Sequence, residues 1–168
     1  DTGQRVAIIG AGPGGLGAAW YLALMGYQVT VFERREFAGG MLRYGIPEYR
    51  LPAEQLDKDI KAVTDLGVEL KTNTEVGKDI KFDKMYSDYD AILFSTGLSK
   101  PYGIDVPGED HPQVIHGLKV LDDVTCEVDP DLGTRVAVIG GGNVAMDAAR
   151  TARRFGAEVT IYYRRREQ

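Results

Sequence analysis

Short apolar runs in the first part of the chain are separated by glycines and by one longer helical stretch. Residues 6–9 and 29–32 are apolar and rich in β-branched side chains, which is typical of strands buried on both faces. Between them, residues 16–25 are rich in alanine and leucine and stop at Gly26, so they predict a helix with a glycine C-cap. The order strand–helix–strand predicts a parallel pair with a right-handed crossover.

The same pattern occurs a second time near the other end of the chain. When residues 5–36 are shifted by 130 positions onto residues 135–166, 13 of the 32 pairs are identical. The second copy predicts a strand, a helix and a second strand at residues 136–139, 144–155 and 159–162. An internal repeat of one strand–helix–strand unit is therefore the organising feature of the sequence.

The region between the copies has weaker patterns. Leu56, Ile60, Val63 and Leu66 recur at helical spacing and predict a helix that ends at Gly67. Residues 68–74 and 91–94 have strand composition. Residues 98–133 contain prolines, glycines and acidic residues, and we expect a connector with one short helix near 118–124.

Three glycines follow the first predicted strand in a G-x-G-x-x-G arrangement. Gly10 permits a tight turn, Gly12 lets a pyrophosphate approach the backbone, and Gly15 lets helix and strand pack closely. Pro13 fits the first helical position, where free N–H groups and the helix dipole favour an anion. Glu33 ends the second strand and can accept hydrogen bonds from an adenosine ribose. The alternative is a tight turn beside a surface glutamate.

The second copy carries a variant of this turn. Gly140, Gly142 and Ala145 form a G-x-G-x-x-A arrangement, and Tyr163 stands where the first copy has Glu33. A carboxylate repels a 2′-phosphate, so its loss predicts that the second copy prefers NADP(H) to NAD(H).

Arginines follow the second strand in both copies. In the second copy, Arg164 and Arg165 are candidates to bind a 2′-phosphate bidentately, and the alternative is that they are solvated surface charges, as Arg34 and Arg35 at the same place in the first copy suggest. In the first copy, Arg34 is a further candidate for cofactor binding, although arginines at this place can also be solvated surface charges. Residues 150–168 carry a local charge of +4, whereas residues 1–149 carry −9.

Composition narrows the class of protein. Of 168 residues, 21 are glycine, well above the roughly 7% of ordinary proteins. The net charge of −5 argues against a nucleic-acid or membrane-surface binder. A single cysteine, Cys126, excludes a disulfide framework, a CxxC pair and a self-contained zinc or iron–sulfur site. No apolar run approaches the roughly 18 residues of a spanning helix and no secretory signal is evident, so we expect a cytoplasmic protein.

Four segments resemble one known family. Residues 39–52 read Gly-Gly-Met-Leu-Arg-Tyr-Gly-Ile-Pro-Glu-Tyr-Arg-Leu-Pro, and residues 95–97, 106–109 and 140–147 match as well. This pattern closely resembles the glutamate synthase small chain. The same family includes the flavin-binding part of dihydropyrimidine dehydrogenase and NADH-dependent ferredoxin:NADP oxidoreductases. The likeness extends over nearly the whole chain.

The resemblance implies an α/β fold, with a Rossmann-like FAD domain followed by the start of a second Rossmann-like NAD(P) domain. It implies that the FAD site comprises Gly10, Gly12, Pro13, Gly14, Gly15, Glu33, Arg34, Gly40, Met41, Leu42, Arg50, Val76, Thr96 and Gly97. It implies that the NADP site comprises Gly140, Gly142, Asn143, Val144, Ala145, Arg164 and Arg165. From the residues alone, Met41 and Leu42 could equally be core residues, and Arg50 could be a surface charge.

The resemblance further implies hydride transfer from NADPH to FAD, followed by electron transfer to iron–sulfur centres of a partner domain or subunit. We expect an FAD-binding domain at residues 1–98, a connector at 99–133 and an incomplete NAD(P)H-binding domain at 134–168. The segments that complete both domains in the family are missing, so we expect a fragment that binds FAD weakly and turns over nothing alone. No catalytic acid, base or nucleophile and no metal ligand is predicted.

Two other functions stay open from the sequence. A nucleotide-binding scaffold would keep the fold without redox turnover. A single-cofactor NAD(P)-dependent dehydrogenase would carry one decayed repeat, although both glycine turns are intact. The terminal electron acceptor is not encoded in any of these motifs.

Overall fold

The computed structural model describes residues 2–164, and the chain divides into two compact units. The first unit comprises residues 1–43 and 51–99, and the second comprises residues 44–50 and 100–168. Residues 100–133, which the sequence suggests as a connector, are thus grouped with the second repeat copy. The functional division into an FAD part, a connector and an NAD(P)H part stays a prediction.

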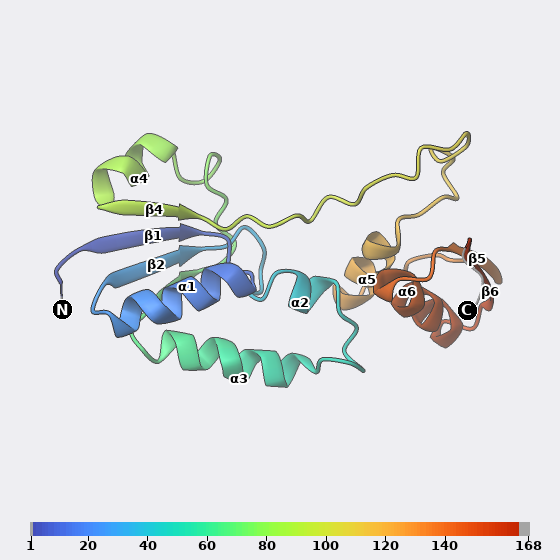
Figure 1. The fold of residues 1–168 in the computed structure, drawn as a ribbon, viewed down its shortest axis with the longest axis horizontal. Helices are drawn as coiled ribbons and strands as arrows, with labels where there is room; N and C mark the ends of the chain where they lie inside the picture. The colour runs from blue at the N-terminus through green and yellow to red at the C-terminus, as the bar shows by residue number, and fades with distance from the viewer. Residues whose placement is uncertain (1, 165–168) are drawn as a thin grey trace. The chain divides into compact units, whose positions relative to one another are not determined.

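The first unit is built on a parallel sheet with the strand order β3-β2-β1-β4 (Figure 1). The strands are β1 (Arg5–Ile9), β2 (Gln28–Phe32), β3 (Glu69–Lys71) and β4 (Ala91–Phe94). The chain runs from β1 outward to β2 and β3 and then returns to β4 on the other side of β1. In open parallel sheets, ligands bind at the carboxyl ends of the strands where the order reverses, which here is between β1 and β4.

Helices cover both faces of this sheet (Figure 1). On one face, α1 (Pro13–Leu24) and α3 (Ala53–Thr64) enclose a core that includes the fully buried Ile8 and Val31. On the other face, α4 (Phe82–Asp88) inserts Met85 against Ala7 and Phe32. The four-residue helix α2 (Met41–Tyr44) follows the glycine pair at 39–40. Burial on both faces explains why β1 and β2 are almost entirely apolar.

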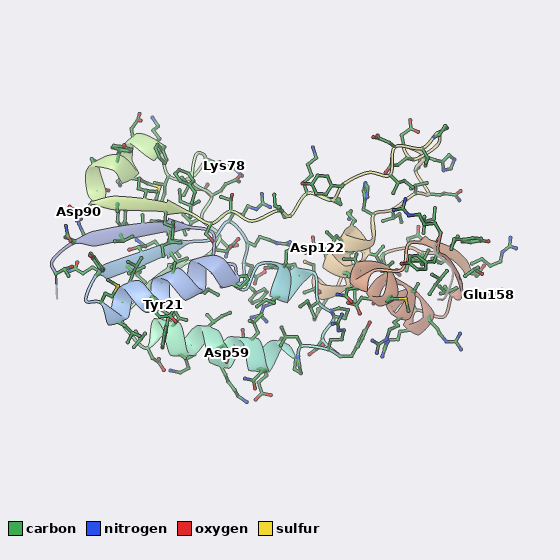
Figure 2. All side chains as sticks on the ribbon, viewed as in Figure 1. Tyr21, Asp59, Lys78, Asp90, Asp122 and Glu158 are labelled. Atoms are coloured by element: carbon green, nitrogen blue, oxygen red, sulfur yellow. The ribbon has the colours of Figure 1, made fainter. Side chains whose placement is uncertain are left out.

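The strand register defines the two ends of the sheet. Ile9 is paired with Phe32 on one side and with Phe94 on the other, so β1, β2 and β4 end together. At the opposite end Asp90, labelled in Figure 2, accepts a hydrogen bond of 2.7 Å from the Arg5 N–H. The loops that leave the carboxyl ends of three strands therefore meet at one edge.

Helix α1 approaches β1 so closely that only glycine fits at one position. A Cβ on Gly15 would lie 2.0 Å from the carbonyl oxygen of Gly10. Two helical positions later, a Cβ on Gly17 would meet nothing within 4 Å. The two glycines of the same helix thus have different reasons to be glycine, and only Gly15 is required by packing.

The second unit repeats the strand–helix–strand pattern with one extra helix. It contains α5 (Gly117–Thr125), β5 (Arg135–Ile139), α6 (Asn143–Arg154) and β6 (Glu158–Tyr162). Strands β5 and β6 form a parallel pair. Figure 2 labels Glu158, where β6 begins. Helix α5 packs closely on α6. A Cβ added to Gly117 in α5 would lie only 3.2 Å from a methyl group of Val144 in α6.

Among the described residues, one face of the β5–β6 pair is covered and the other is exposed. Along β5, Val136 and Val138 are half-buried, whereas Ala137 and Ile139 between and after them are exposed. A parallel pair of two strands therefore leaves one of its faces without a covering layer.

Residues 44–50, which we call the strap, dock on α6 within the second unit. Nη1 of Arg50 lies 2.5 Å from Oδ2 of Asp147, whose side chain is only 6% exposed. The Tyr49 ring lies against two guanidinium groups, 4.5 Å from that of Arg150 and 3.8 Å from that of Arg154. An ion pair from the half-exposed Arg50 to a buried carboxylate and two cation–π contacts therefore hold the strap on this helix.

Most of the predicted helices and strands are present. The differences occur where the sequence pattern was weak. The helix predicted near 118–124 is α5, and the glycines 26, 67 and 156 that follow helices all have positive φ. The strand predicted over 68–74 is shorter, because β3 pairs only with residues 30–32 of β2. Helices α2 and α4 were not predicted. None of the described helices is both long and apolar enough to cross a membrane.

The two glycines of α1 generate a matched stability prediction. We expect Gly15→Ala to lower the free energy of unfolding by about 1–3 kcal/mol, because the new methyl group overlaps a backbone carbonyl that cannot move freely. Gly17→Ala should raise it by up to about 1 kcal/mol, since alanine favours the helix. Urea unfolding followed by fluorescence of Trp20, the only tryptophan of the chain, measures both. Similar effects of the two substitutions would contradict the close approach.

The strap generates a second prediction. Arg50→Met should lower the free energy of unfolding by about 1.5–3 kcal/mol, because it leaves the Asp147 carboxylate buried without its cation. The double variant Arg50→Met, Asp147→Leu removes both charges and should regain most of this loss. Urea titrations followed by circular dichroism compare the three proteins. If the double variant is as unstable as the single one, the ion pair does not hold the strap.

Candidate nucleotide sites

The first glycine turn, residues 10–15, lies at the carboxyl edge of the four-stranded sheet. The Gly10 N–H donates to the carbonyl of Phe32 at 2.8 Å, and φ of Gly10 is +105°. A Cβ on Gly10 would lie 2.3 Å from the carbonyl oxygen of Ser95, which directly follows β4. The turn is thus tight against both neighbouring strands, and its first glycine is required by conformation and by space.

The amino end of α1 offers hydrogen-bond donors and carries no side-chain cap. Gly12 is the N-cap in an extended conformation, Pro13 follows it, and the first turn holds no acidic residue. Among the described residues, the N–H groups of Gly14 and Gly15 make no hydrogen bond outside the helix. Gly40 closes over Gly12, since a Cβ on Gly40 would lie 2.8 Å from the Gly12 Cα. Uncapped N–H groups beside bare backbone fit an anionic diphosphate.

Glu33 is fixed beside this turn. It is 8% exposed, and its carboxylate accepts hydrogen bonds from the Ala11 N–H at 2.9 Å and from the Arg35 N–H at 3.0 Å. Each carboxylate oxygen has a further lone pair. Glu33 is therefore a pre-oriented acceptor at the end of β2, as recognition of ribose hydroxyl groups requires.

The other residues predicted for the first site occupy varied surroundings. Arg34 is exposed and donates to the Ser99 hydroxyl at 3.3 Å. Met41 and Leu42 are half-buried in α2, so neither is a fully buried core residue. Val76 packs against the cluster of Ala7, Phe32 and Met85. Thr96 and Gly97 are exposed after β4. The structure thus gathers Gly12, Gly40 and Glu33 around the turn through direct contacts.

The second glycine turn, residues 140–145, reproduces the backbone of the first. The Gly140 N–H donates to the carbonyl of Tyr162 at 2.9 Å, and φ of Gly140 is +126°. Gly142 is the N-cap of α6 in an extended conformation, without a side-chain cap. A Cβ on Gly140 would lie 3.3 Å from the Cβ of Ala145, so alanine is accommodated at the third position. Gly142, Asn143 and Val144 are exposed.

The end of β6 differs from the end of β2. Tyr163 occupies the position of Glu33, and its ring lies over Gly141. Arg164 is exposed directly after it. Arg165, the other candidate for phosphate binding, lies outside the described residues. The second site therefore has no carboxylate where the first site has one.

Arg50 is paired with Asp147, and its predicted role beside the flavin stays a prediction. Sequence reasoning gave no role to Asp147, to Ser95 or to Tyr49. The signal for Asp147 is an acidic residue in the alanine-rich stretch of α6. Ser95 is placed by register alone, because it follows a strand that ends beside β1.

The two turns together describe what the molecule can bind. Each presents uncapped N–H groups at the start of a helix and a glycine backbone that a diphosphate can approach. Within the described site residues, the side chains offer hydrogen bonds and shape, and no pairing of acid, base or nucleophile.

Proteins of known name align with this chain over almost its whole length, including both glycine turns. The chain is 51% identical to the beta subunit of NADP(+)-dependent formate dehydrogenase from Moorella thermoacetica, over 98% of this chain and 24% of that protein. It is 40% identical to the small chain of glutamate synthase [NADPH] from Escherichia coli K12, over 100% of this chain and 38% of that protein. The chain thus spans roughly a quarter to two fifths of these relatives.

A solved structure has a fold similar to that of this chain. Mycobacterium tuberculosis FprA in complex with NADPH superimposes with a TM-score of 0.77 at 27% identity, over 88% of this chain and 36% of that chain. The expectation of an α/β, Rossmann-like fold is confirmed.

A family description matches almost the entire sequence. It is that of the pyridine nucleotide-disulphide oxidoreductases, and it covers residues 4–168, including both glycine turns. The resemblance to the glutamate synthase small chain is confirmed by the named relatives within the same match. The chain therefore belongs to the pyridine nucleotide-disulphide oxidoreductase family.

Proposed function

We propose that this chain is the cofactor-binding part of an NADPH-dependent flavin oxidoreductase that works in the cytoplasm. FAD is assigned to the first glycine turn and NADPH to the second. The observation that carries this assignment is the presence of two uncapped glycine turns of the same geometry that differ in the residue after the second strand.

The first site fits a dinucleotide with a free ribose 2′-hydroxyl. The N–H groups of Gly14 and Gly15 are donors for the pyrophosphate, and Gly12 and Gly40 leave the backbone open to it. Glu33 is already oriented by two backbone N–H groups and accepts from the ribose. We further assign Arg34, Met41, Leu42, Val76, Thr96 and Gly97 to the surroundings of this cofactor.

The second site fits a dinucleotide with a 2′-phosphate. Gly142, Asn143, Val144 and Ala145 form the exposed start of α6, which is the place for the pyrophosphate. The absence of a carboxylate at position 163 removes a repulsion, and the exposed Arg164 adds a cation. The relative from Moorella thermoacetica is named as NADP(+)-dependent and the one from Escherichia coli as acting with NADPH, which supports this choice.

Bound together, the two cofactors supply hydride transfer from nicotinamide to flavin and then release of single electrons. The chain's own residues bind and orient them, and they provide no acid or base of their own. Several relatives are named as subunits of larger enzymes, which supports a partner domain or subunit as electron acceptor. We propose iron–sulfur centres as that acceptor. In this proposal residues 1–98 bind FAD, residues 99–133 are a connector, and residues 134–168 bind NADPH.

Visible absorption tests the proposal directly. Because the isolated 168-residue chain is expected to bind FAD weakly, FAD is kept in excess, and we expect its absorption band to shift on binding. One equivalent of anaerobic NADPH should then reduce the bound flavin faster than NADH does, because only NADPH carries the 2′-phosphate that Arg164 can bind. No spectral shift at saturating protein would contradict the first site, and equal reduction rates with the two nucleotides would contradict the second.

Glu33 allows a sharper test of the first site. Glu33→Gln removes one acceptor and the negative charge, and we expect FAD to bind at least tenfold more weakly, which corresponds to about 1.4 kcal/mol. Quenching of flavin fluorescence measures the affinity, and a thermal melt without FAD shows whether the fold is kept. The matched control is Glu36→Gln, a nearby exposed carboxylate, which should leave the affinity unchanged. Equal affinities for both variants would remove Glu33 from the site.

A further inference from the structure

Ser95, the residue after β4, is held against the first glycine turn by its backbone. Its N–H donates to the carbonyl of Ile9 at 2.8 Å, which extends the pairing of β4 with β1 by one residue. Its own carbonyl faces Gly10 so closely that a Cβ on that glycine would lie 2.3 Å from the oxygen. Contacts on both sides therefore fix the place from which the Ser95 side chain starts.

The Ser95 hydroxyl lies beside Gly14, in the first turn of α1. A Cβ on Gly14 would lie 3.0 Å from Oγ of Ser95, which is closer than ordinary van der Waals contact. Because a Cα–Cβ bond in a helix is tilted toward the amino end, this space lies on the side of the uncapped N–H groups of α1. Ser95 is half-buried, and within the described part of the chain its hydroxyl makes no hydrogen bond.

The same contact explains why residue 14 is glycine. The φ angle of Gly14 is not positive, so its backbone conformation is open to other residues. Outside its own helix and its chain neighbours, the Ser95 oxygen is the one described atom within 4 Å of a Cβ on Gly14. A shift of 130 residues relates Gly14 to Val144, so the second copy carries a branched side chain at the same position of the turn. Glycine at position 14 thus leaves room for the Ser95 hydroxyl.

We infer that Ser95 is a further binding residue of the first site, and that its hydroxyl donates a hydrogen bond to the diphosphate at the amino end of α1. This inference rests on the proposed function and deepens it, because it adds a side-chain donor from β4 to the backbone donors of Gly14 and Gly15. A hydroxyl has one proton to donate, and a hydrogen bond to a charged acceptor is stronger than one between neutral groups. The diphosphate is then held from both strands, β1 and β4, between which the strand order reverses.

Flavin binding tests this role by removal of one hydroxyl. The shift of the flavin absorption band, followed while the 168-residue chain is added to FAD, gives the dissociation constant. We expect Ser95→Ala to weaken FAD binding about fivefold or more. The matched control is Ser87→Ala in α4, which removes an exposed hydroxyl that donates to the Lys84 carbonyl at 2.8 Å, and it should leave the affinity unchanged. Full FAD affinity of Ser95→Ala would overturn the inference.

Nucleotide fragments distinguish contact with the diphosphate from an effect on the fold. The amide resonances of Gly14 and Gly15 in a nuclear magnetic resonance titration report on the first turn, and those of Val144 and Ala145 report on the second. At the first turn we expect Ser95→Ala to weaken ADP about fivefold or more, and to leave the affinity for adenosine unchanged, because adenosine has no phosphate. Equal losses for ADP and adenosine would overturn the inference.

Gly14 provides a second variant of the same contact. Gly14→Ala should displace the Ser95 hydroxyl and weaken FAD about threefold or more. Added to Ser95→Ala, it should have little further effect, because alanine at position 95 has no hydroxyl to displace. Two losses that add in full would show that Gly14 does not serve the hydroxyl, and they would overturn the inference.

The outcomes separate the inference from the function beneath it. If the unaltered chain binds neither FAD nor ADP at the amides of Gly14 and Gly15, the FAD assignment fails and the inference fails with it. If FAD binds there and Ser95→Ala keeps the full affinity, only the inference is overturned. In the protein without ligand, we expect nuclear Overhauser cross-peaks between the Hβ protons of Ser95 and the Hα protons of Gly14. Their absence would overturn the inference whatever the binding data show.

Discussion

The close approach of backbone to backbone at the glycine turn is the constraint on which the first unit depends. Gly15 faces the carbonyl of Gly10 with no space for a side chain, and Gly10 faces the carbonyl of Ser95 in the same way. These contacts fix the start of α1 against the carboxyl ends of β1 and β4. The uncapped N–H groups of the helix therefore lie at the edge of the sheet where a ligand can reach them.

In the second unit, the helix and the glycine turn approach each other less closely. Ala145 stands where the first unit has Gly15, and its Cβ lies 3.3 Å from the position of a Cβ on Gly140. The backbone of that turn thus leaves enough room for one methyl group. The strand pair beneath it is covered on one face only, and α5 and the strap add packing to α6 instead. The two copies share a turn while their surroundings differ.

Local patterns were sufficient to predict the repeated elements, because each strand is a short apolar run and each helix is bounded by a glycine turn and a glycine cap. The same reasoning missed α4, where the only buried anchor is Met85 and no helical periodicity is visible in the sequence. From spacing it predicted that Glu33 and the glycines lie at one edge of the sheet, and the structure brings them together there. It could not pair Arg50 with Asp147, because these residues are 97 positions apart and no local pattern relates them. Contacts between distant segments depend on how the units fold, which spacing does not encode.

The comparison of the two copies separates the residues that shape the turn from the residues that differ beside it. Gly10 and Gly140 both have positive φ, Gly12 and Gly142 both cap a helix in extended conformation, and these positions are identical. The residue after the second strand differs completely, as an acid in one copy and an aromatic ring in the other. Its neighbour inside the turn differs with it, from alanine to glycine, because a carboxylate needs only the N–H of that residue whereas a ring needs its side-chain space. The residue after the second strand and the residue inside the turn are distant in sequence and adjacent in the fold, and they therefore differ together between the two copies.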